Sequence, residues 1–168
     1  MKKSIVLLFV FITFVFADNK KIPNIEIKLI DGKKIKIAKL LEDGPVLINF
    51  WATWCAPCKK EMRYLNKYQK EFKYFTVLAI NEDKTRSFSR VKSFIRSKKY
   101  DFIVGLDPNG LLFKQLGGSV VPTNLLIDTD RTILWKHQGY LPGDEKIMKK
   151  EIEKAIKEYQ KKLKTSKK

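Results

Sequence analysis

The chain is poor in the residues that hold metal ions and haem. Its 168 residues include two cysteines, Cys55 and Cys58, and one histidine, His137. A zinc site needs four ligands, usually two cysteine pairs or one pair with histidines, so the composition argues against zinc. Covalent haem attachment requires a histidine directly after the second cysteine, and Lys59 stands there instead. We therefore expect neither a metal nor another cofactor.

The scarcity of cysteine also excludes a fold held together by several disulfides. Exported domains that need covalent support carry several spaced cysteines, whereas this chain has a single pair in the motif C-A-P-C. A disulfide that closes so small a loop constrains the unfolded chain very little, so a purely structural role would add little stability. The interpretation that remains for Cys55 and Cys58 is a dithiol/disulfide redox centre.

Long apolar runs are absent except for one near the N-terminus. Residues 5–16 (IVLLFVFITFVF) follow Lys2 and Lys3 and precede Ala17, which is the layout of an export signal. As a helix the run would be about 18 Å long, well short of the roughly 30 Å hydrocarbon core of a bilayer. We expect residues 1–17 to be an export signal that is cleaved, with an uncleaved anchor as the alternative. No cysteine near Ala17 offers a site for lipid attachment.

Export would place the mature chain, residues 18–168, in the periplasm or another extracytoplasmic compartment, where disulfides form. Acidic residues are few there: the whole chain has 35 Lys and Arg against 18 Asp and Glu, a formal net charge of +17. This surplus favours acidic partners or weak association with an anionic membrane surface. The alternative is a lysine-rich solvated exterior, because the lysines are spread over many segments. Without an aromatic and basic recognition pattern, we expect no nucleic-acid partner.

The mature chain is long enough for one domain with its own core. Residues 24–30 and 33–37 alternate apolar and polar side chains around Asp31-Gly32, which predicts a hairpin with a tight primed turn. Residues 46–52 and 75–81 are apolar runs, and residues 58–72 between them carry apolar side chains at helical spacing. This order predicts two parallel central strands joined by a helix.

The second half of the chain continues the alternation of strands and helices. We expect a helix at 87–98, a strand at 102–107, a helix from Asp107-Pro108 to Gly117-Gly118, a hairpin from 120–128 and 132–140, and a terminal helix from Gly143 with a frayed end at 161–168. The whole predicts an α/β fold with a mixed central sheet flanked by helices.

The cysteine pair lies where the first buried strand passes into a helix. Cys55 at this junction faces unpaired backbone N–H groups and the positive end of the helix, which lowers the pKa of its thiol. At the free pKa of about 8.5 only roughly 3% of a cysteine side chain is thiolate at pH 7, whereas a pKa near 7 raises the thiolate fraction to about half. This predicts Cys55 as the nucleophile and Cys58, one turn further in, as the resolving thiol. Pro57 is tolerated in the first helical turn and fixes the loop.

The segment NFWATWCAPCKKE, residues 49–61, resembles the active-site segment of the thioredoxin superfamily, and specifically of its exported TlpA/ResA-like branch. The likeness covers most of the mature chain. It implies a thioredoxin-like fold over residues 18–168, with an N-terminal β-hairpin and an inserted helix-strand unit. It also implies a thiol:disulfide oxidoreductase with a redox-active Cys55–Cys58 disulfide.

The resemblance implies a proton acceptor on the helix. Thioredoxin itself has a buried acid six residues before the first cysteine, where this chain has Asn49. The TlpA/ResA-like proteins carry an acid three residues after the second cysteine, and Glu61 stands there. By its spacing Glu61 lies about one turn from Cys58, and the alternative is a solvated glutamate favoured by the helix dipole. The family often has a helix-kinking proline two residues later, where this chain has Arg63.

Val121-Pro122-Thr123 resembles the cis-proline loop of the family, which packs against the disulfide and offers backbone to an extended substrate. An ordinary strand-edge proline is the alternative. The apolar rim expected around this loop consists of Trp54, Ala56 and Pro57. Three other residues are expected to be structural: Trp51 and Trp135 in the core, and His137 as a structural or exposed side chain.

The function implied by the resemblance is reduction of disulfides in exported client proteins such as apocytochrome c, whose cysteines must be reduced before haem attaches. Electrons would come from a membrane partner of the CcdA/DsbD type. An oxidant or isomerase for secreted proteins is an alternative, because direction depends on the reduction potential. A non-catalytic binding module is another. A thiol peroxidase usually sets a Thr three residues before its cysteine, whereas Thr53 is two before Cys55.

Overall fold

The computed structural model describes residues 20–165, so the predicted export signal at residues 1–17 lies outside the described part. The strands are β1 (Glu26–Leu29), β2 (Lys34–Lys36), β3 (Val46–Trp51), β4 (Thr76–Asn81), β5 (Ile103–Leu106), β6 (Thr123–Ile127) and β7 (Ile133–Gln138). The helices are α1 (Ile37–Leu40), α2 (Ala56–Glu71), α3 (Phe88–Lys98), α4 (Leu111–Gln115) and α5 (Asp144–Thr165), with 3₁₀ turns η1 (Leu41–Asp43) and η2 (Thr85–Ser87).

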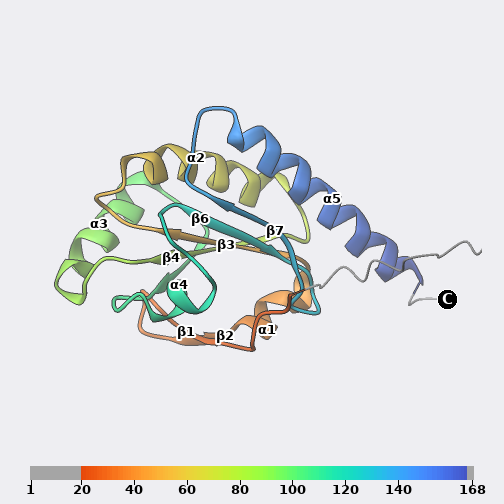
Figure 1. Cartoon of the computed structure of the whole chain (residues 1–168), viewed down its shortest axis with the longest axis horizontal. Coiled ribbons are helices and arrows are strands. Elements are labelled where there is room, and N and C mark those ends of the chain that lie inside the picture. The colour runs from red at the N-terminus through yellow and green to blue at the C-terminus, as the bar shows by residue number, and fades with distance from the viewer. Residues whose placement is uncertain (1–19, 166–168) are drawn as a thin grey trace, which may run out of the picture.

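The seven strands form one mixed sheet in the order β2-β1-β5-β4-β3-β6-β7. The central strands β3, β4 and β5 are parallel, and the outer pairings are antiparallel. Helices α2, α3 and α5 cover one face of the sheet, and α1 and α4 cover the other (Figure 1). The predicted α/β class, the mixed sheet and the thioredoxin-like order of elements are confirmed.

Strand β3 shows how the sequence builds both cores. All six of its residues are buried, and successive side chains of a strand point to opposite faces. Leu47 and Trp51 therefore pack in the core beneath α2 and α5, while Ile48 and Phe50 pack in the core on the α1 and α4 side. Burial on both faces explains why this segment reads as a continuous apolar run.

Three local predictions are corrected by the structure. The β1–β2 hairpin is present, but both primed turns need positive φ at the first central residue, and of Asp31 and Gly32 only the second, Gly32, has it, at +93°. Helix α4 begins at Leu111, because the carboxylate of Asp107 accepts hydrogen bonds from the backbone N–H groups of Leu111 and Phe113 ahead of the first turn. Helix α5 continues to Thr165, so most of the segment expected to fray is helical.

The two ends of the sheet have different neighbours. At one end β3 finishes at Trp51 and leads through a short loop into α2. At the other end the described chain begins beside the β6–β7 turn, where the N–H of Ile133 donates to the carbonyl of Lys20 (3.0 Å) and the N–H of Ile22 to that of Arg131 (3.0 Å). Within residues 20–165, no helix is both long and apolar enough to cross a membrane.

Candidate active site

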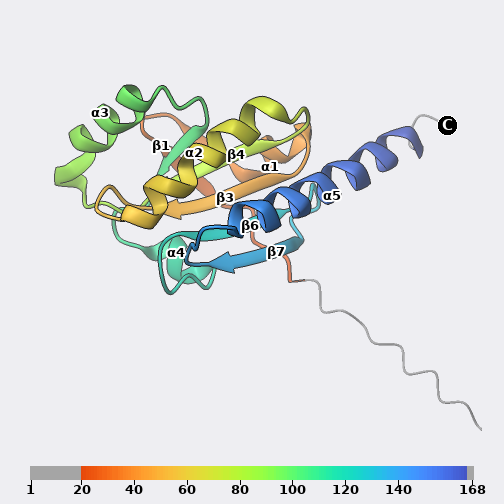
Figure 2. The same ribbon diagram turned by 90° about the horizontal axis from the view of Figure 1, so that it is seen from above.

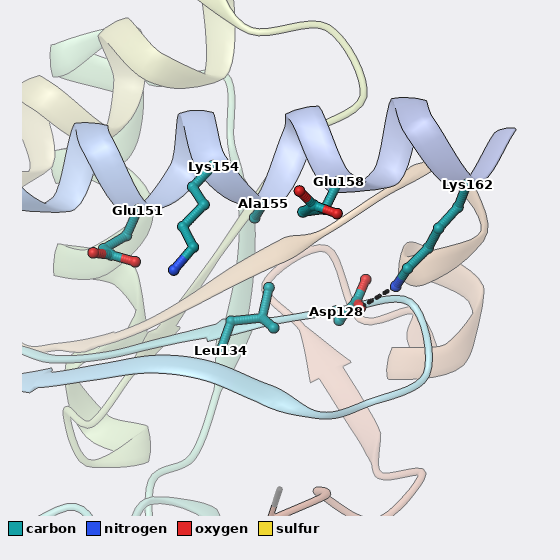
Figure 3. Close-up of a pocket in the computed structure, with 7 residues that line it drawn as sticks. All are labelled: Asp128, Leu134, Glu151, Lys154, Ala155, Glu158 and Lys162. Carbon is teal, nitrogen blue, oxygen red and sulfur yellow. Dashed lines mark hydrogen bonds and ion pairs between the residues drawn. The ribbon is translucent and has the colours of Figure 1, made fainter. Parts of the chain in front are cut away.

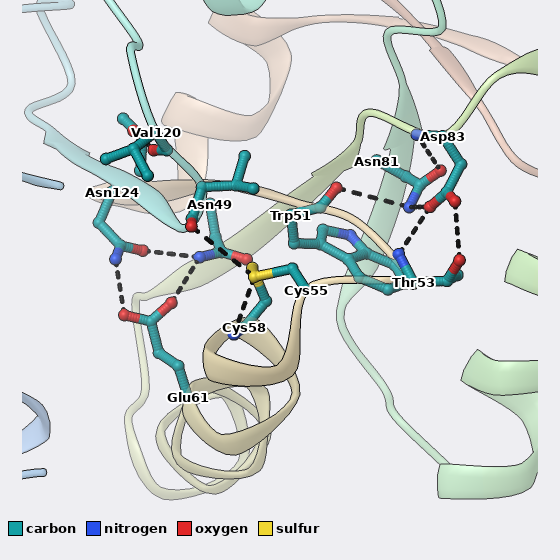
Figure 4. The surroundings of a disulfide bond; sticks show 12 residues. Asn49, Trp51, Thr53, Cys55, Cys58, Glu61, Asn81, Asp83, Val120 and Asn124 are labelled. Carbon is teal, nitrogen blue, oxygen red and sulfur yellow. Dashed lines mark hydrogen bonds between the residues drawn. A yellow bond between two sulfur atoms is a disulfide. The ribbon is translucent and has the colours of Figure 1, made fainter. Parts of the chain in front are cut away.

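Cys55 and Cys58 form a disulfide at the N-terminus of α2, with their Cα atoms 5.3 Å apart. Cys55 is the N-cap residue, and its Sγ accepts a hydrogen bond from the N–H of Cys58 at 3.1 Å (Figure 4). In the reduced protein the same N–H and the helix dipole stabilise a thiolate at Cys55. Cys55 keeps 4% of its surface exposed and Cys58 keeps none, so Cys55 is the more accessible of the two.

The loop before β6 lies against the disulfide. The carbonyl oxygen of Val121 is 3.7 Å from Sγ of Cys55, and the Val121–Pro122 peptide bond is cis. Thr123 has no exposed surface, and its hydroxyl donates to the carbonyl of Val120 at 2.6 Å. The side chain of Thr123 thus holds the loop in place, and its contact with a substrate stays a prediction.

Exposed apolar side chains surround the disulfide. Trp54 is 69% exposed and Val120 is 50% exposed. Ala56 and Pro57 are exposed in the first turn of α2, and Val121 is half-buried. The structure therefore places Trp54, Ala56 and Pro57 on an accessible rim beside Cys55, together with Val120, which the sequence reasoning did not select.

Glu61 lies under the disulfide with no exposed surface. Its Oε2 accepts a hydrogen bond from Nδ2 of Asn49 (2.8 Å), and its Oε1 accepts one from Nδ2 of Asn124 (2.7 Å). Asn49 and Asn124 are direct partners across the antiparallel β3–β6 pairing, and Nδ2 of Asn49 also donates to Oδ1 of Asn124 (2.9 Å, Figure 4). The alternative of a solvated glutamate is wrong, because the carboxyl group is enclosed by these two amides.

Burial raises the pKa of Glu61 to about 8. The hydrogen bonds from Asn124 and Asn49 act in the opposite direction, because they stabilise the ionised carboxylate, and the nearby charge of Asp144 raises the pKa further. The carboxyl group therefore keeps its proton in most molecules at pH 7 and exchanges it near pH 8. A pKa close to the working pH is what a general acid or base requires.

The loop between β3 and α2 is hydrogen-bonded to Asp83, which has 4% of its surface exposed. Oδ2 of Asp83 accepts the N–H of Thr53 (2.7 Å) and Nδ2 of Asn81 (2.8 Å), and Oδ1 accepts the hydroxyl of Thr53 (2.7 Å). These bonds fix the backbone two residues before Cys55. Asp83 was not selected from the sequence, although an acid two residues after the second buried strand was visible there.

Asn124 was also missed, although a polar residue in the otherwise apolar run TNLLI was a usable signal. Next to it in the β6–β7 register lies His137, whose Nε2 is 3.0 Å from Oδ2 of Asp144 and whose ring stacks on Trp135. These contacts agree with a structural role for His137. Helix α2 runs unbroken past Arg63, the position where the family often has a kinking proline.

A separate pocket lies beneath α5, over β6 and β7, and Asp128 and Lys162 form an ion pair at one end of it (Figure 3). None of its lining residues belongs to the disulfide site; they are Asp128, Leu134, Glu151, Lys154, Ala155, Glu158 and Lys162. Across residues 20–165, no group of three or more His, Cys, Asp or Glu side chains is arranged to hold a metal ion.

Comparison with known proteins assigns this site to a family. The Redoxin family model matches residues 17–156. The thiol-disulfide oxidoreductase ResA of Bacillus thuringiensis subsp. konkukian (strain 97-27) is 35% identical over 120 residues, which cover 71% of this chain and 69% of that protein. The thiol:disulfide interchange protein DsbE of Yersinia pestis is 30% identical over 143 residues, covering 84% of this chain and 73% of the relative.

Solved structures agree with the sequence relatives. A crystal structure named for the thiol:disulfide interchange protein DsbE from Chlorobium tepidum superposes with a TM-score of 0.75 at 28% identity, covering 82% of this chain and 96% of the other. The family match extends over most of the chain and includes the helix N-terminus that carries the cysteines. The chain therefore belongs to the Redoxin family and is a ResA/DsbE-like thiol-disulfide oxidoreductase with a Cys55–Cys58 disulfide.

Proposed function

We propose that the protein is an exported reductant of disulfides in client proteins, with apocytochrome c as the client class suggested by the family. The observation that carries this proposal is the buried Glu61 carboxyl group, held by Asn49 and Asn124 one helical turn beyond Cys58. In this proposal Cys55, Cys58 and Glu61 are the catalytic residues, and the rim and the Val121-Pro122 backbone bind the client.

The proposed reaction moves two electrons from the enzyme dithiol to the client disulfide. The Cys55 thiolate attacks one client sulfur, so a mixed disulfide forms and the other client sulfur leaves and takes up a proton. Glu61 in its ionised form then accepts the proton of Cys58. The Cys58 thiolate attacks Sγ of Cys55 and releases the second client thiolate. The client is reduced, and the enzyme is left with the Cys55–Cys58 disulfide.

The surroundings of Cys58 support the reducing direction. A strong oxidant such as DsbA owes its high potential to a stabilised reduced form. Here the buried Glu61 follows the buried Cys58 by one helical turn, and in the molecules in which Glu61 is ionised, its charge disfavours a second negative charge on that sulfur. The reduced form therefore gains little from ionising Cys58. Restoring the dithiol requires an electron donor, and we propose a membrane partner of the CcdA/DsbD type.

The reduction potential of the Cys55–Cys58 couple tests the direction. We expect a value closer to the approximately −270 mV of thioredoxin than to the roughly −120 mV of DsbA when the protein is equilibrated with thiol redox buffers. A value near that of DsbA would support the oxidant or isomerase alternative. Failure to reduce insulin at any potential would instead support the non-catalytic binding module.

The export proposal has a separate test. N-terminal sequencing of the protein recovered from the extracytoplasmic fraction should give a chain that begins at Asp18. An intact N-terminus in the membrane fraction would identify the uncleaved anchor. Recovery only from the cytoplasm would contradict export, because the proposed disulfide chemistry on secreted clients takes place outside.

A further inference from the structure

The unit inserted between β4 and β5 is unusual in its charge. Residues 84–100, which include η2 and α3, contain seven Lys and Arg residues and no acid. Helix α5 is different, because its basic side chains alternate with acidic ones along the sequence. The positive surplus of the protein is therefore uneven, and the inserted unit holds an uncompensated part of it.

This unit lies beside the N-terminal half of α2, at the end of the sheet that carries the disulfide (Figure 2). Nζ of Lys59, the residue after Cys58, is 5.8 Å from the centre of the Phe94 ring on α3. The Phe94 ring is in turn 5.5 Å from that of Trp51, at the end of β3. Helix α3 thus packs against the first turn of α2, the turn that follows Cys55.

We define the α2–α3 basic surface by five exposed residues: Lys59, Lys60, Arg63, Arg86 and Arg90. In the described part of the chain none of the five forms an ion pair, whereas lysines elsewhere do, such as Lys149 with Glu71 and Lys162 with Asp128. The acids nearest in sequence are buried: Glu61 lies beneath α2, and Asp83, three residues before Arg86, accepts hydrogen bonds from Thr53. The field of these five cations therefore extends into solvent, because none of them is neutralised by an ion pair within residues 20–165.

We propose that the α2–α3 basic surface docks an acidic segment of the protein whose disulfide reacts with Cys55. This inference rests on the proposed function, and it adds a property of the partner: acidic residues close to its reactive cysteines. Charge complementarity beside the disulfide would raise the rate of encounter and orient the partner. A lipid surface fits less well, because the patch adjoins the nucleophile and lies at the opposite end of the sheet from Lys20, where the described chain begins.

The test uses short disulfide-bonded peptides that differ only in whether Glu, Ser or Lys flanks the cysteines. Rates of reduction are divided by the rate on 2-hydroxyethyl disulfide, a small neutral substrate. We expect the Glu peptide to react about tenfold or more faster than the Ser peptide at about 20 mM salt, the Lys peptide to be slowest, and the differences to disappear near about 0.5 M salt. Equal normalised rates at low salt would overturn the proposal.

Two variants with the same change in net charge locate the effect. Arg86→Glu with Arg90→Glu reverses charge on the α2–α3 basic surface, and Lys157→Glu with Lys161→Glu reverses it on exposed positions of α5. We expect the first variant to lose the preference for the Glu peptide and the second to keep it. Equal loss in both would show that only net charge matters, which would contradict a docking surface.

A binding measurement separates this proposal from the proposed function. Fluorescence anisotropy of a labelled Glu-rich peptide without cysteines reports docking to the oxidised protein, whatever its catalytic rate. Absence of turnover on 2-hydroxyethyl disulfide would contradict the proposed function alone, while absence of salt-sensitive peptide binding would contradict the docking surface alone. If the arginine variant loses binding to anionic phosphatidylglycerol vesicles but keeps its preference for the Glu peptide, the surface serves lipid and the proposal is wrong.

Discussion

Glu61 shows how the environment of a single residue changes its chemistry. A glutamate in the first turns of a helix is ordinarily solvated and ionised at neutral pH. Here removal from water raises the pKa of Glu61 to about 8, and two asparagine amides partly offset that rise. The side chain can therefore take or give a proton close to the pH at which thiols ionise.

Single replacements of the cysteines should separate their roles. We expect Cys58→Ser to accumulate a mixed disulfide with a client peptide through Cys55, because the nucleophile remains and the resolving thiol is gone. Cys55→Ser should trap almost nothing, since Cys58 is fully buried. Non-reducing gels measure both. Equal trapping by the two variants would contradict the assignment of Cys55 as the nucleophile and Cys58 as the resolving thiol.

Glu61→Gln should slow the resolving step, because the ionised carboxylate that accepts the proton of Cys58 is lost. We expect a fall of roughly tenfold to a thousandfold in the rate of disulfide reduction, within the usual contribution of general acid-base catalysis. In the unmodified protein the rate should rise through about pH 8 as Glu61 ionises. The variant should lack that inflection and keep only those of the thiols, and identical profiles from pH 5 to pH 9 would rule out a catalytic part for Glu61.

The same carboxyl group should make the stability of the oxidised protein depend on pH. The folded pKa of about 8 lies above the ordinary value of 4.5, so between these values the folded state holds a proton that the unfolded state has released. The contribution of Glu61 to stability is complete below about pH 4.5 and is lost as pH rises toward 8, by up to about 1.4 kcal/mol per pH unit. Urea unfolding across this range should show that slope, and Glu61→Gln should reduce it.

Replacing Asn124 should change the pKa of Glu61 without altering the surface that binds a client. Asn124→Leu removes a donor to the carboxylate, which destabilises the ionised form and raises the pKa of Glu61. A hydrogen bond to a charged group contributes about 1.5 to 3 kcal/mol, so the inflection in the rate profile should move upward by roughly one to two pH units. An inflection that stays in place would mean that Asn124 contributes packing alone.

The loop between β3 and α2 depends on contacts from a neighbouring element. Asp83, which follows β4, accepts the N–H and the hydroxyl of Thr53 and so anchors the backbone that presents Cys55. These hydrogen bonds are buried, so removing the Asp83 carboxylate leaves the donors of Thr53 without a partner where water cannot replace it. The position of Cys55 thus depends on the segment after β4 as well as on helix α2.

Replacing Asp83 by Ala should therefore destabilise the protein by about 2 to 4 kcal/mol. Asp101→Ala is the matched control, because the side chain of Asp101 forms an exposed ion pair with Lys70 (2.9 Å), and such pairs contribute about 0 to 1 kcal/mol. Thermal or chemical unfolding of the two variants measures the difference. Similar losses in both would show that the contacts with Thr53 are unimportant for the fold.

Across the whole protein, the excess of basic over acidic residues, 35 against 18, should make stability depend on salt. Unpaired like charges repel in the folded state, and salt screens this repulsion, with a Debye length that falls from about 30 Å at 0.01 M to about 8 Å at 0.15 M. We expect the Tm to rise by a few degrees over this range of sodium chloride, as measured by calorimetry. A fall would mean that the exposed ion pairs outweigh the repulsion.

The redox centre and the class of fold could be predicted from the sequence because they depend on local patterns. The single cysteine pair at a strand-to-helix junction, the apolar run of β3 and the helical spacing from Met62 to Phe72 are each contained in a short segment. Secondary-structure periodicity and thiol chemistry act over such distances. Predictions of helix and turn boundaries were wrong where a single side chain sets the boundary, as the Asp107 carboxylate does at the start of α4.

The tertiary structure alone decided which polar groups meet. Asn49 and Asn124 are 75 residues apart in sequence and become neighbours only through the antiparallel register of β3 and β6. The sequence placed Glu61 a turn beyond Cys58, but its burial, and with it the rise in the pKa, depends on the strands beneath the helix. In the same way residues 84–100 show their charge in the sequence, while their place beside Lys59 follows from the packing of α3 against α2. Contacts between distant segments are set by the lowest free energy of the whole packed chain, and no short stretch of sequence contains that information.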